Sequence, residues 1–272
     1  MIKIMSFNIR YGIADDGDNH WDKRKSLAIS RIHAFQPDLL GMQECRDDSQ
    51  ADFVKASLPD YHFYGMRREG RGDTALEMAP VLFRKDSFQI IDQGCFWLSE
   101  TPHIAGSKSW DSTFARTATW LKLLQHETGR TLTFVNTHFD YQPVAIDESA
   151  KLLKNWLNQT QKDMPVILTG DFNADKDSGA YHLLTAPGML IDSYRQIHST
   201  GNDEATFHGF GKSEEMTSID WVLVSRHFDA TEAKVGRSNA CGRTLSLRSL
   251  SCGRDCELEG GDIMLRMQWS LT

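Results

Sequence analysis

The sequence predicts a single α/β (α+β) domain with mixed β-sheets, and three features of the chain lead to this fold class. The N-terminal part reads as strand, helix and strand, which is the pattern of a β-α-β unit. Strand-like stretches then follow one another in the middle of the chain without helices between them, which favours antiparallel pairing. No internal repeat, low-complexity tract or Ser/Pro-rich linker interrupts the chain. We therefore expect one domain.

The first part of the chain supplies the β-α-β unit. Residues 2–8 alternate apolar and polar side chains and end at Asn8, as a strand does. The next helix is predicted to be capped by Asp22 and ended by Pro37. An apolar strand over 38–44 then finishes in an acid. The next predicted elements are a helix over 48–58, a strand over 61–64 and an Arg- and Gly-rich surface loop over 66–77, whose arginines we expect to be solvated rather than bound to substrate.

The second part of the chain contains the clearest strand. Four apolar or β-branched residues, 166–169, precede Gly170, and the run then reaches Asp171 and Asn173. Side chains alternate along a strand, so these two polar groups should point the same way while Phe172 points into the core. The other predicted elements are strands over 79–84, 88–99, 115–124, 131–137 and 218–224, an amphipathic helix over 144–161 and a short helix over 178–184.

Composition limits the class of ligand. The chain has 272 residues, a formal charge of −7 and a pI near 5.8, with 40% hydrophobic and 25% charged residues. A soluble globular protein of this kind lacks the cationic surface that grips many phosphates of a duplex, so strong binding of long duplex DNA is not expected. A small anionic substrate, or an anion met through a divalent cation, fits better.

The termini and cysteines predict a compartment. The N-terminus leads directly into a strand pattern, without an apolar signal-peptide core, and no apolar run approaches the ~18 residues of a membrane span. The five cysteines are odd in number, and Cys45 and Cys95 stand alone in strand-like sequence, which favours buried reduced thiols. We expect a cytoplasmic protein without a membrane partner. The sequence makes no prediction of oligomeric state.

Polar side chains recur where predicted strands end. Taken singly, each has an ordinary alternative: a Glu after an apolar run is often a helix cap or a surface acid, and a lone His is often structural. Strand ends on one side of a sheet converge in space, so a whole set of them is expected to form a site. The set comprises Asn8, Glu44, His138, Asp171, Asn173 and Asp220.

The chemistry of this set favours phosphate esters. Its hard oxygen donors, with no Cys/His pair at zinc spacing, indicate Mg²⁺ or Mn²⁺ rather than Zn²⁺. Such a cation neutralises phosphate oxygens and stabilises charge on the leaving oxygen. We expect Asp171 to orient or deprotonate water with help from Asn173, and His138 to donate a hydrogen bond to the developing phosphorane oxygens.

Five ordered motifs carry a resemblance to a known family. They are Met5-Ser-Phe-Asn8-Ile-Arg, Met42-Gln-Glu44, Asn136-Thr-His138-Phe-Asp140, Gly170-Asp171-Phe-Asn173-Ala and Ser218-Ile-Asp220-Trp. Their order and spacing resemble the endonuclease/exonuclease/phosphatase (DNase I-like) superfamily over residues 1–243. Segments 96–102, 106–111 and 115–120 resemble a bacterial branch related to the deadenylases.

The resemblance implies a fold and a set of roles. The fold is a four-layer α/β sandwich, in which two mixed sheets pack face to face between helices, with the site at one edge. The activity is divalent-metal-dependent hydrolysis of a phosphodiester or phosphomonoester. The implied roles are metal binding by Glu44 and Asn8, phosphate contact by His138 and Asn173, water activation by Asp171, a place in the same site for Asp220, and a substrate-phosphate contact by Arg116, for which a structural ion pair is the alternative.

The C-terminal part departs from this pattern. Members of the superfamily finish with a Ser-Asp-His motif on a last strand, but Thr244–Cys252 follows Arg243 here and no histidine occurs after His227. Three interpretations remain open: a reading-frame slip after Arg243, a variant with another base, or a module that binds metal and phosphate without turnover. We expect an atypical tail over 244–272 that leaves the sheet without its last strand, and hence low solubility or marginal stability.

Overall fold

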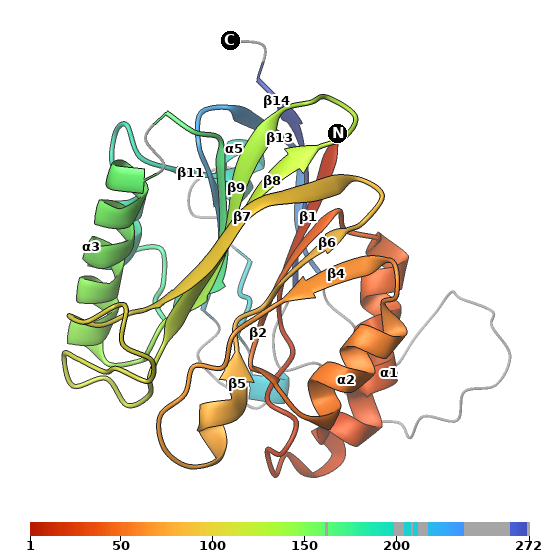
Figure 1. Ribbon diagram of the computed structural model, residues 1–272, viewed down its shortest axis with the longest axis vertical. Coiled ribbons are helices and arrows are strands. Elements are labelled where there is room, and N and C mark those ends of the chain that lie inside the picture. Colours follow the sequence, from red (N-terminus) through yellow and green to blue (C-terminus); the bar gives the residue numbers. More distant parts are fainter. Residues whose placement is uncertain (161–162, 199–203, 208, 212–216, 237–261, 271–272) are drawn as a thin grey trace, which may run out of the picture.

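The computed structural model describes residues 1–160, 163–198, 204–207, 209–211, 217–236 and 262–270 (Figure 1). Two six-stranded sheets pack face to face, and helices cover their outer faces. The first sheet has the order β13 (Phe228–Gly236), β14 (Asp262–Trp269), β1 (Ile2–Asn8), β2 (Leu39–Gln43), β6 (Val81–Arg84), β4 (Tyr61–Tyr64). The second has the order β11 (Ile191–Asp192), β12 (Asp220–Val224), β10 (Val166–Asp171), β9 (Thr131–His138), β8 (Thr117–Gln125), β7 (Phe88–Trp97).

Each sheet contains one parallel pair and is otherwise antiparallel. In the first sheet β1 is parallel to β2, and in the second β9 is parallel to β10. Helix α1 (Trp21–Phe35) connects the first pair and α3 (Pro143–Thr160) connects the second. Both sheets are therefore mixed, and the predicted α/β sandwich is confirmed.

The helices form the outer layers of the sandwich. Helix α1 and α2 (Ser49–Ser57) pack on the first sheet, and α3 and α4 (Gly179–Leu184) pack on the second, so they lie on opposite sides of the molecule in Figure 1. The remaining elements are α5 (Ser193–Ile197), the small ladder of β3 (Cys45–Arg46) and β5 (Glu77–Met78), and the 3₁₀ helices η1 (Gly17–Asn19), η2 (Asp73–Leu76) and η3 (Gly209–Gly211).

Three apolar clusters hold the layers together. The central one lies between the sheets and includes Ile4 of β1, Phe134 of β9 and Leu265 of β14, each fully buried. The two others join each sheet to its helices. Phe172, which follows β10, is fully buried and stacks on Trp221, as its position after the strand predicts. The thiol of Cys45 is buried and free, and that of Cys95 is free and partly buried.

The expectation that the tail leaves the first sheet without its last strand is wrong. Strand β14 lies between β1 and β13 and is antiparallel to both. The buried residues Ile263, Leu265 and Met267 alternate with less buried positions and fill the space between the sheets. The edge that we expected to be exposed is therefore paired. The domain boundary at 243 stays a prediction, because it lies outside the described residues.

Two local expectations also need correction. The helix predicted to be capped by Asp22 is capped two residues earlier, by His20, whose Nδ1 accepts a hydrogen bond from the Asp22 N–H at 3.3 Å. The loop over 66–77 is not uniformly solvated, because Arg68 is only 4% exposed. The guanidinium group of Arg68 forms an ion pair with the buried carboxylate of Glu77, a contact that the sequence pattern does not predict.

Candidate active site

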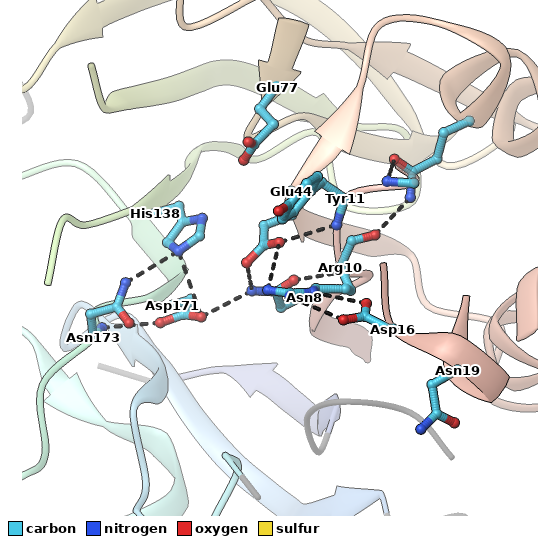
Figure 2. Close-up of polar contacts among 12 residues, drawn as sticks. Asn8, Arg10, Tyr11, Asp16, Asn19, Glu44, Glu77, His138, Asp171 and Asn173 are labelled. Carbon is cyan, nitrogen blue, oxygen red and sulfur yellow. Dashed lines mark hydrogen bonds and ion pairs between the residues drawn. The ribbon is translucent and has the colours of Figure 1, made fainter. Parts of the chain in front are cut away.

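The two parallel strand pairs end at the same edge of the sandwich, where a cavity of about 310 Å³ opens between the sheets. The first sheet delivers two of the predicted residues to this cavity, and the second delivers the others (Figure 2). The alternative, in which these residues are helix caps and surface acids scattered over the molecule, is excluded because the whole set lines one cavity. The predicted residues that line it are Asn8, Glu44, Arg116, His138, Asp171, Asn173 and Asp220.

Asn8 joins the two halves of the site. Its Nδ2 donates to Glu44 Oε1 and to Asp171 Oδ2, both at 3.0 Å. Its Oδ1 accepts from the Arg10 N–H at 2.9 Å and retains a second lone pair. The amide of Tyr11 donates to the other oxygen of Glu44 at 3.1 Å. One carboxylate from each sheet is thus held beside a single side-chain amide (Figure 2).

Asp171 and His138 lie in the second sheet beside the turn that follows β10. Asp171 Oδ1 accepts from the Asn173 N–H at 3.0 Å. The Asn173 side chain donates to the Phe139 carbonyl at 2.9 Å and contacts His138 Nε2 at 3.2 Å. Burial, followed by the charges of nearby arginines, lowers the pKa of His138 well below its ordinary value. The imidazole is therefore neutral, with one ring nitrogen as a donor and the other as an acceptor.

Two buried acids face each other across neighbouring strands. Asp171 of β10 is the register partner of Asp220 of β12, and they are 5% and 4% exposed. Burial raises the pKa of Asp171 to about 6, against the opposing effect of the hydrogen bond from Asn8. Burial and the charge of Asp171 raise the pKa of Asp220 well above its ordinary value. The pair therefore takes up a proton more readily than exposed carboxyls do.

Three residues of the cavity have left-handed backbone conformations. Arg10, Glu44 and Asn173 have φ values of 54°, 60° and 48°. Residues other than glycine avoid this region, and a Glu there is held by its surroundings. The conformation places Glu44 between β2 and β3, where its carboxylate meets Asn8 and the Tyr11 amide. Clustering of such backbones is typical of functional sites.

Two buried arginines form one wall of the cavity. Arg68 pairs with Glu77 at 2.8 Å, and Arg116 lies 3.8 Å from Asp140. Both guanidinium groups lie over the ring of Phe114, at 4.6 and 5.3 Å from its centre. Nε of Arg116 has no hydrogen-bond partner within the described residues, although it is buried.

The electrostatics of this wall favour an anion. Burial and the neighbouring Arg116 lower the pKa of Arg68 to about 10. Burial likewise raises the pKa of Glu77 to about 7, more than its attraction to Arg68 lowers it. Two positive groups that are close together and removed from water are stabilised by a negative ligand.

Sequence reasoning missed several side chains of the site. Arg68 was assigned to solvent and Glu77 to a loop, yet both line the cavity beside His138. The aromatic residues Tyr11 and Phe207 also line it. A signal for Glu77 exists in the sequence, because this acid directly precedes the apolar run that leads into β6.

The donor set fits a hard divalent cation. Within the described ranges there is no group of three or more His, Cys, Asp or Glu side chains arranged to hold a metal ion. Mg²⁺ does not need such a cage, because it is usually held by one or two carboxylates, with water and substrate phosphate completing its shell. Glu44 and Asn8 offer a carboxylate and an amide oxygen in the lining of the cavity, which matches that mode of binding.

Comparison with known proteins places the chain in a family. The model of the endonuclease/exonuclease/phosphatase family matches residues 5–241. The chain belongs to this family. The endonuclease/exonuclease/phosphatase family comprises hydrolases of phosphate esters, and the predicted superfamily resemblance is confirmed.

Solved structures and a curated relative resemble this chain over most of its length. A crystal structure of the endonuclease/exonuclease/phosphatase from Bacteroides vulgatus superposes with a TM-score of 0.85 at 28% identity, covering 99% of both chains. The mannosyl-6-phosphatase Bt3783 of Bacteroides thetaiotaomicron gives 0.82 at 28% identity, covering 98% of this chain and 100% of that one. Nocturnin of Xenopus laevis is 24% identical over 233 residues, and the aligned region covers 79% of this chain but 57% of nocturnin.

In the described part of the chain no helix combines the length and the apolar character that crossing a membrane requires.

Proposed function

We propose that the protein is a Mg²⁺- or Mn²⁺-dependent phosphoesterase that hydrolyses a small phosphomonoester or phosphodiester by attack of water. One observation carries this proposal: Asn8 brings a carboxylate of the first sheet, Glu44, within reach of a carboxylate of the second, Asp171, in a cavity that also contains His138. An acid that could bind a metal, a candidate base and a neutral hydrogen-bond donor thus line the same cavity.

Each residue has a role that its surroundings support. Glu44 and Asn8 would hold the cation, which neutralises phosphate oxygens and stabilises the leaving oxygen. Asp171, with its pKa raised to about 6, is suited to orient water and take its proton near neutral pH. Asn173 fixes the Asp171 carboxylate through its backbone N–H. His138, which is neutral, donates to phosphate oxygens as their charge grows.

The arginine wall supports an anionic substrate. Arg116, and with it Arg68, would contact phosphate oxygens of a bound substrate. The acidic chain, with a net charge of −7, favours a compact substrate over a long duplex. The similarity to a mannosyl-6-phosphatase supports a sugar phosphate as the substrate class.

The proposal is tested with chromogenic phosphomonoester and phosphodiester substrates. We expect turnover that requires Mg²⁺ or Mn²⁺, stops with a chelator and is lost in Glu44→Ala. Glu127→Ala, which removes an exposed acid in the turn between β8 and β9, serves as the matched control and should retain activity. Turnover that persists without a divalent cation would overturn the proposal.

A second candidate is a module of the same fold that binds metal and phosphate without hydrolysis. It is favoured by one observation, the absence of the Ser-Asp-His motif from the sequence after Arg243. The positions where that motif is expected lie outside the described residues, so the geometry does not separate the two candidates. Binding of Mn²⁺ without hydrolysis at any pH would identify the module. The nucleotide sequence across codons 240–272 tests the frame slip, since a shifted frame should encode Ser-Asp-His.

A further inference from the structure

A buried asparagine connects the two sheets directly beneath the cavity. Asn136 of β9 is 0% exposed, and both ends of its amide are occupied. Nδ2 donates to the carbonyls of Met42 and Pro80, at 2.6 and 3.0 Å, and both belong to the first-sheet side. Oδ1 accepts from Gln43 Nε2 at 2.7 Å and from Thr169 Oγ1 at 3.0 Å. Four hydrogen bonds, the full capacity of this amide, therefore fix its position.

The sheets approach each other closely at this point because β2 has a glycine there. A Cβ on Gly41 would overlap Thr169 Oγ1 and lie 2.5 Å from Asn136 Oδ1, below the separation that real Cβ atoms show. Gln43 Nε2 extends the network to the Ser6 hydroxyl of β1 at 3.2 Å. We call the hydrogen-bonded set of Ser6, Gln43, Asn136 and Thr169 the bridge. It links the central strands β1, β2, β9 and β10, which together carry most of the site residues.

Three residues of the bridge stand one or two positions before site residues in the sequence. Gln43 immediately precedes Glu44, and Asn136 and Thr169 each stand two residues before His138 and Asp171. Since residues two apart on a strand share a face, Asn136 and His138 both point into the space between the sheets. A displacement of the bridge therefore moves one half of the site relative to the other.

We propose that Asn136 is a positioning residue that sets the distance between the metal-binding half of the site, Asn8 and Glu44, and the half in the second sheet that contains His138 and Asp171. The inference rests on the proposed function. Asn136 itself has no spare donor or acceptor, so its four hydrogen bonds hold the two sheets at one separation. Misplacement of catalytic groups by about 1 Å costs on the order of 100-fold in rate.

The test uses two variants and a matched control. Asn136→Leu removes all four bonds at similar volume, and Thr169→Val removes only the hydroxyl at 3.0 Å from Asn136. Ser225→Ala removes a buried hydroxyl that accepts from the Val166 N–H at 2.9 Å, at the far end of β10 and within one sheet. All three should lower the melting temperature, so stability alone does not separate them.

Kinetics and binding separate positioning from stability. We expect kcat to fall about 100-fold in Asn136→Leu and about fivefold in Thr169→Val, with Ser225→Ala within about twofold of the parent. Calorimetric titration without substrate should give a Kd for Mn²⁺ within about threefold of the parent in every variant, because Asn8 and Glu44 belong to one parallel pair. Unchanged kcat in Asn136→Leu, or a large loss in Ser225→Ala, would overturn the inference.

Binding of inorganic phosphate keeps the inference testable if the parent protein hydrolyses nothing. Phosphate bound in the presence of Mn²⁺ would contact both halves of the site, so Asn136→Leu should weaken its Kd at least about tenfold while the Kd of Mn²⁺ stays unchanged. In that case the proposed function fails and the positioning role stands. Equal phosphate affinity in parent and variant would refute the positioning role whatever the activity.

Discussion

Single side chains decide which anion the cavity accepts, and Arg116 is the clearest case. Its buried guanidinium group lies 3.8 Å from Asp140, too far for a strong ion pair, and its Nε lacks a hydrogen-bond partner in the described parts of the chain. We therefore expect its main partner to be substrate. A hydrogen bond to a charged group contributes about 1.5–3 kcal/mol.

Replacing this arginine should thus weaken use of an anionic substrate. We predict that Arg116→Gln lowers kcat/KM about 10- to 100-fold, chiefly through a higher KM. Arg226→Gln, whose side chain is 77% exposed, is the control and should leave both constants unchanged. Steady-state kinetics on the chromogenic monoester give the measurement. A normal KM in Arg116→Gln would mean that the arginine is structural.

The buried acid Glu77 predicts a pH dependence of stability. Its pKa in the folded protein is about 7, against an ordinary value of 4.5 that the unfolded chain retains. Between these values the folded state holds a proton that the unfolded chain has released, so stability falls as pH rises through this window and stays lower above it.

Glu77→Gln removes that titration. Denaturant unfolding of the metal-free protein from about pH 4 to pH 8 should show parent and variant diverging, with the parent losing on the order of 1–3 kcal/mol relative to the variant as pH rises. The exposed acid Glu127, changed to Gln, should leave the parent curve unaltered. A parent–variant difference that is constant with pH would contradict the prediction.

Among the elements, β14 contributes more to the fold than the sequence pattern led us to expect. It is hydrogen-bonded on both sides, to β1 and to β13, and Leu265 at its centre is fully buried between the sheets. We predict that Leu265→Ala lowers the free energy of unfolding by about 2–5 kcal/mol. Gln268→Ala, at an exposed position of the same strand, should cost much less. Equal and small losses would show that β14 contributes little to the core.

How much of the fold was predictable differs from element to element. The strand over 165–171 agrees with β10, Val166–Asp171, because a continuous apolar run leaves few alternatives. Strand β14 was not predicted, although Leu265 and Met267 alternate with the polar Arg266 and Gln268, because the unusual composition before it favoured an atypical tail.

The residues of the site also differ in how far the sequence predicts their position. Residues that end strands, such as Glu44 and Asp171, could be predicted because sequence position alone carries them to the sheet edge. The burial of Arg68 could not be predicted, because it depends on Phe114 and Glu77, and the first of these is brought to it only by the tertiary fold. The cross-sheet bonds of Asn136 were hidden for the same reason.

At the scale of the whole molecule, a cation shared by strand ends should stabilise the entire sandwich. A ligand that binds only the folded state adds about 2.7 kcal/mol when present at 100 times its Kd. We predict that Mn²⁺ at this excess raises the melting temperature of the parent protein and leaves that of Glu44→Gln unchanged. Calorimetric scans with and without chelator provide the measurement, and an equal shift in both proteins would place the ion elsewhere.

The position of β14 between β1 and β13 also has a consequence for synthesis. During synthesis β1 cannot pair with β14 until residues 263–267 have left the ribosome, because Ile2–Ser6 of β1 pairs with Ile263–Met267. Until then, this side of β1 is an open edge with unpaired amides. Translation speed and chaperone capture should therefore affect the yield of this protein.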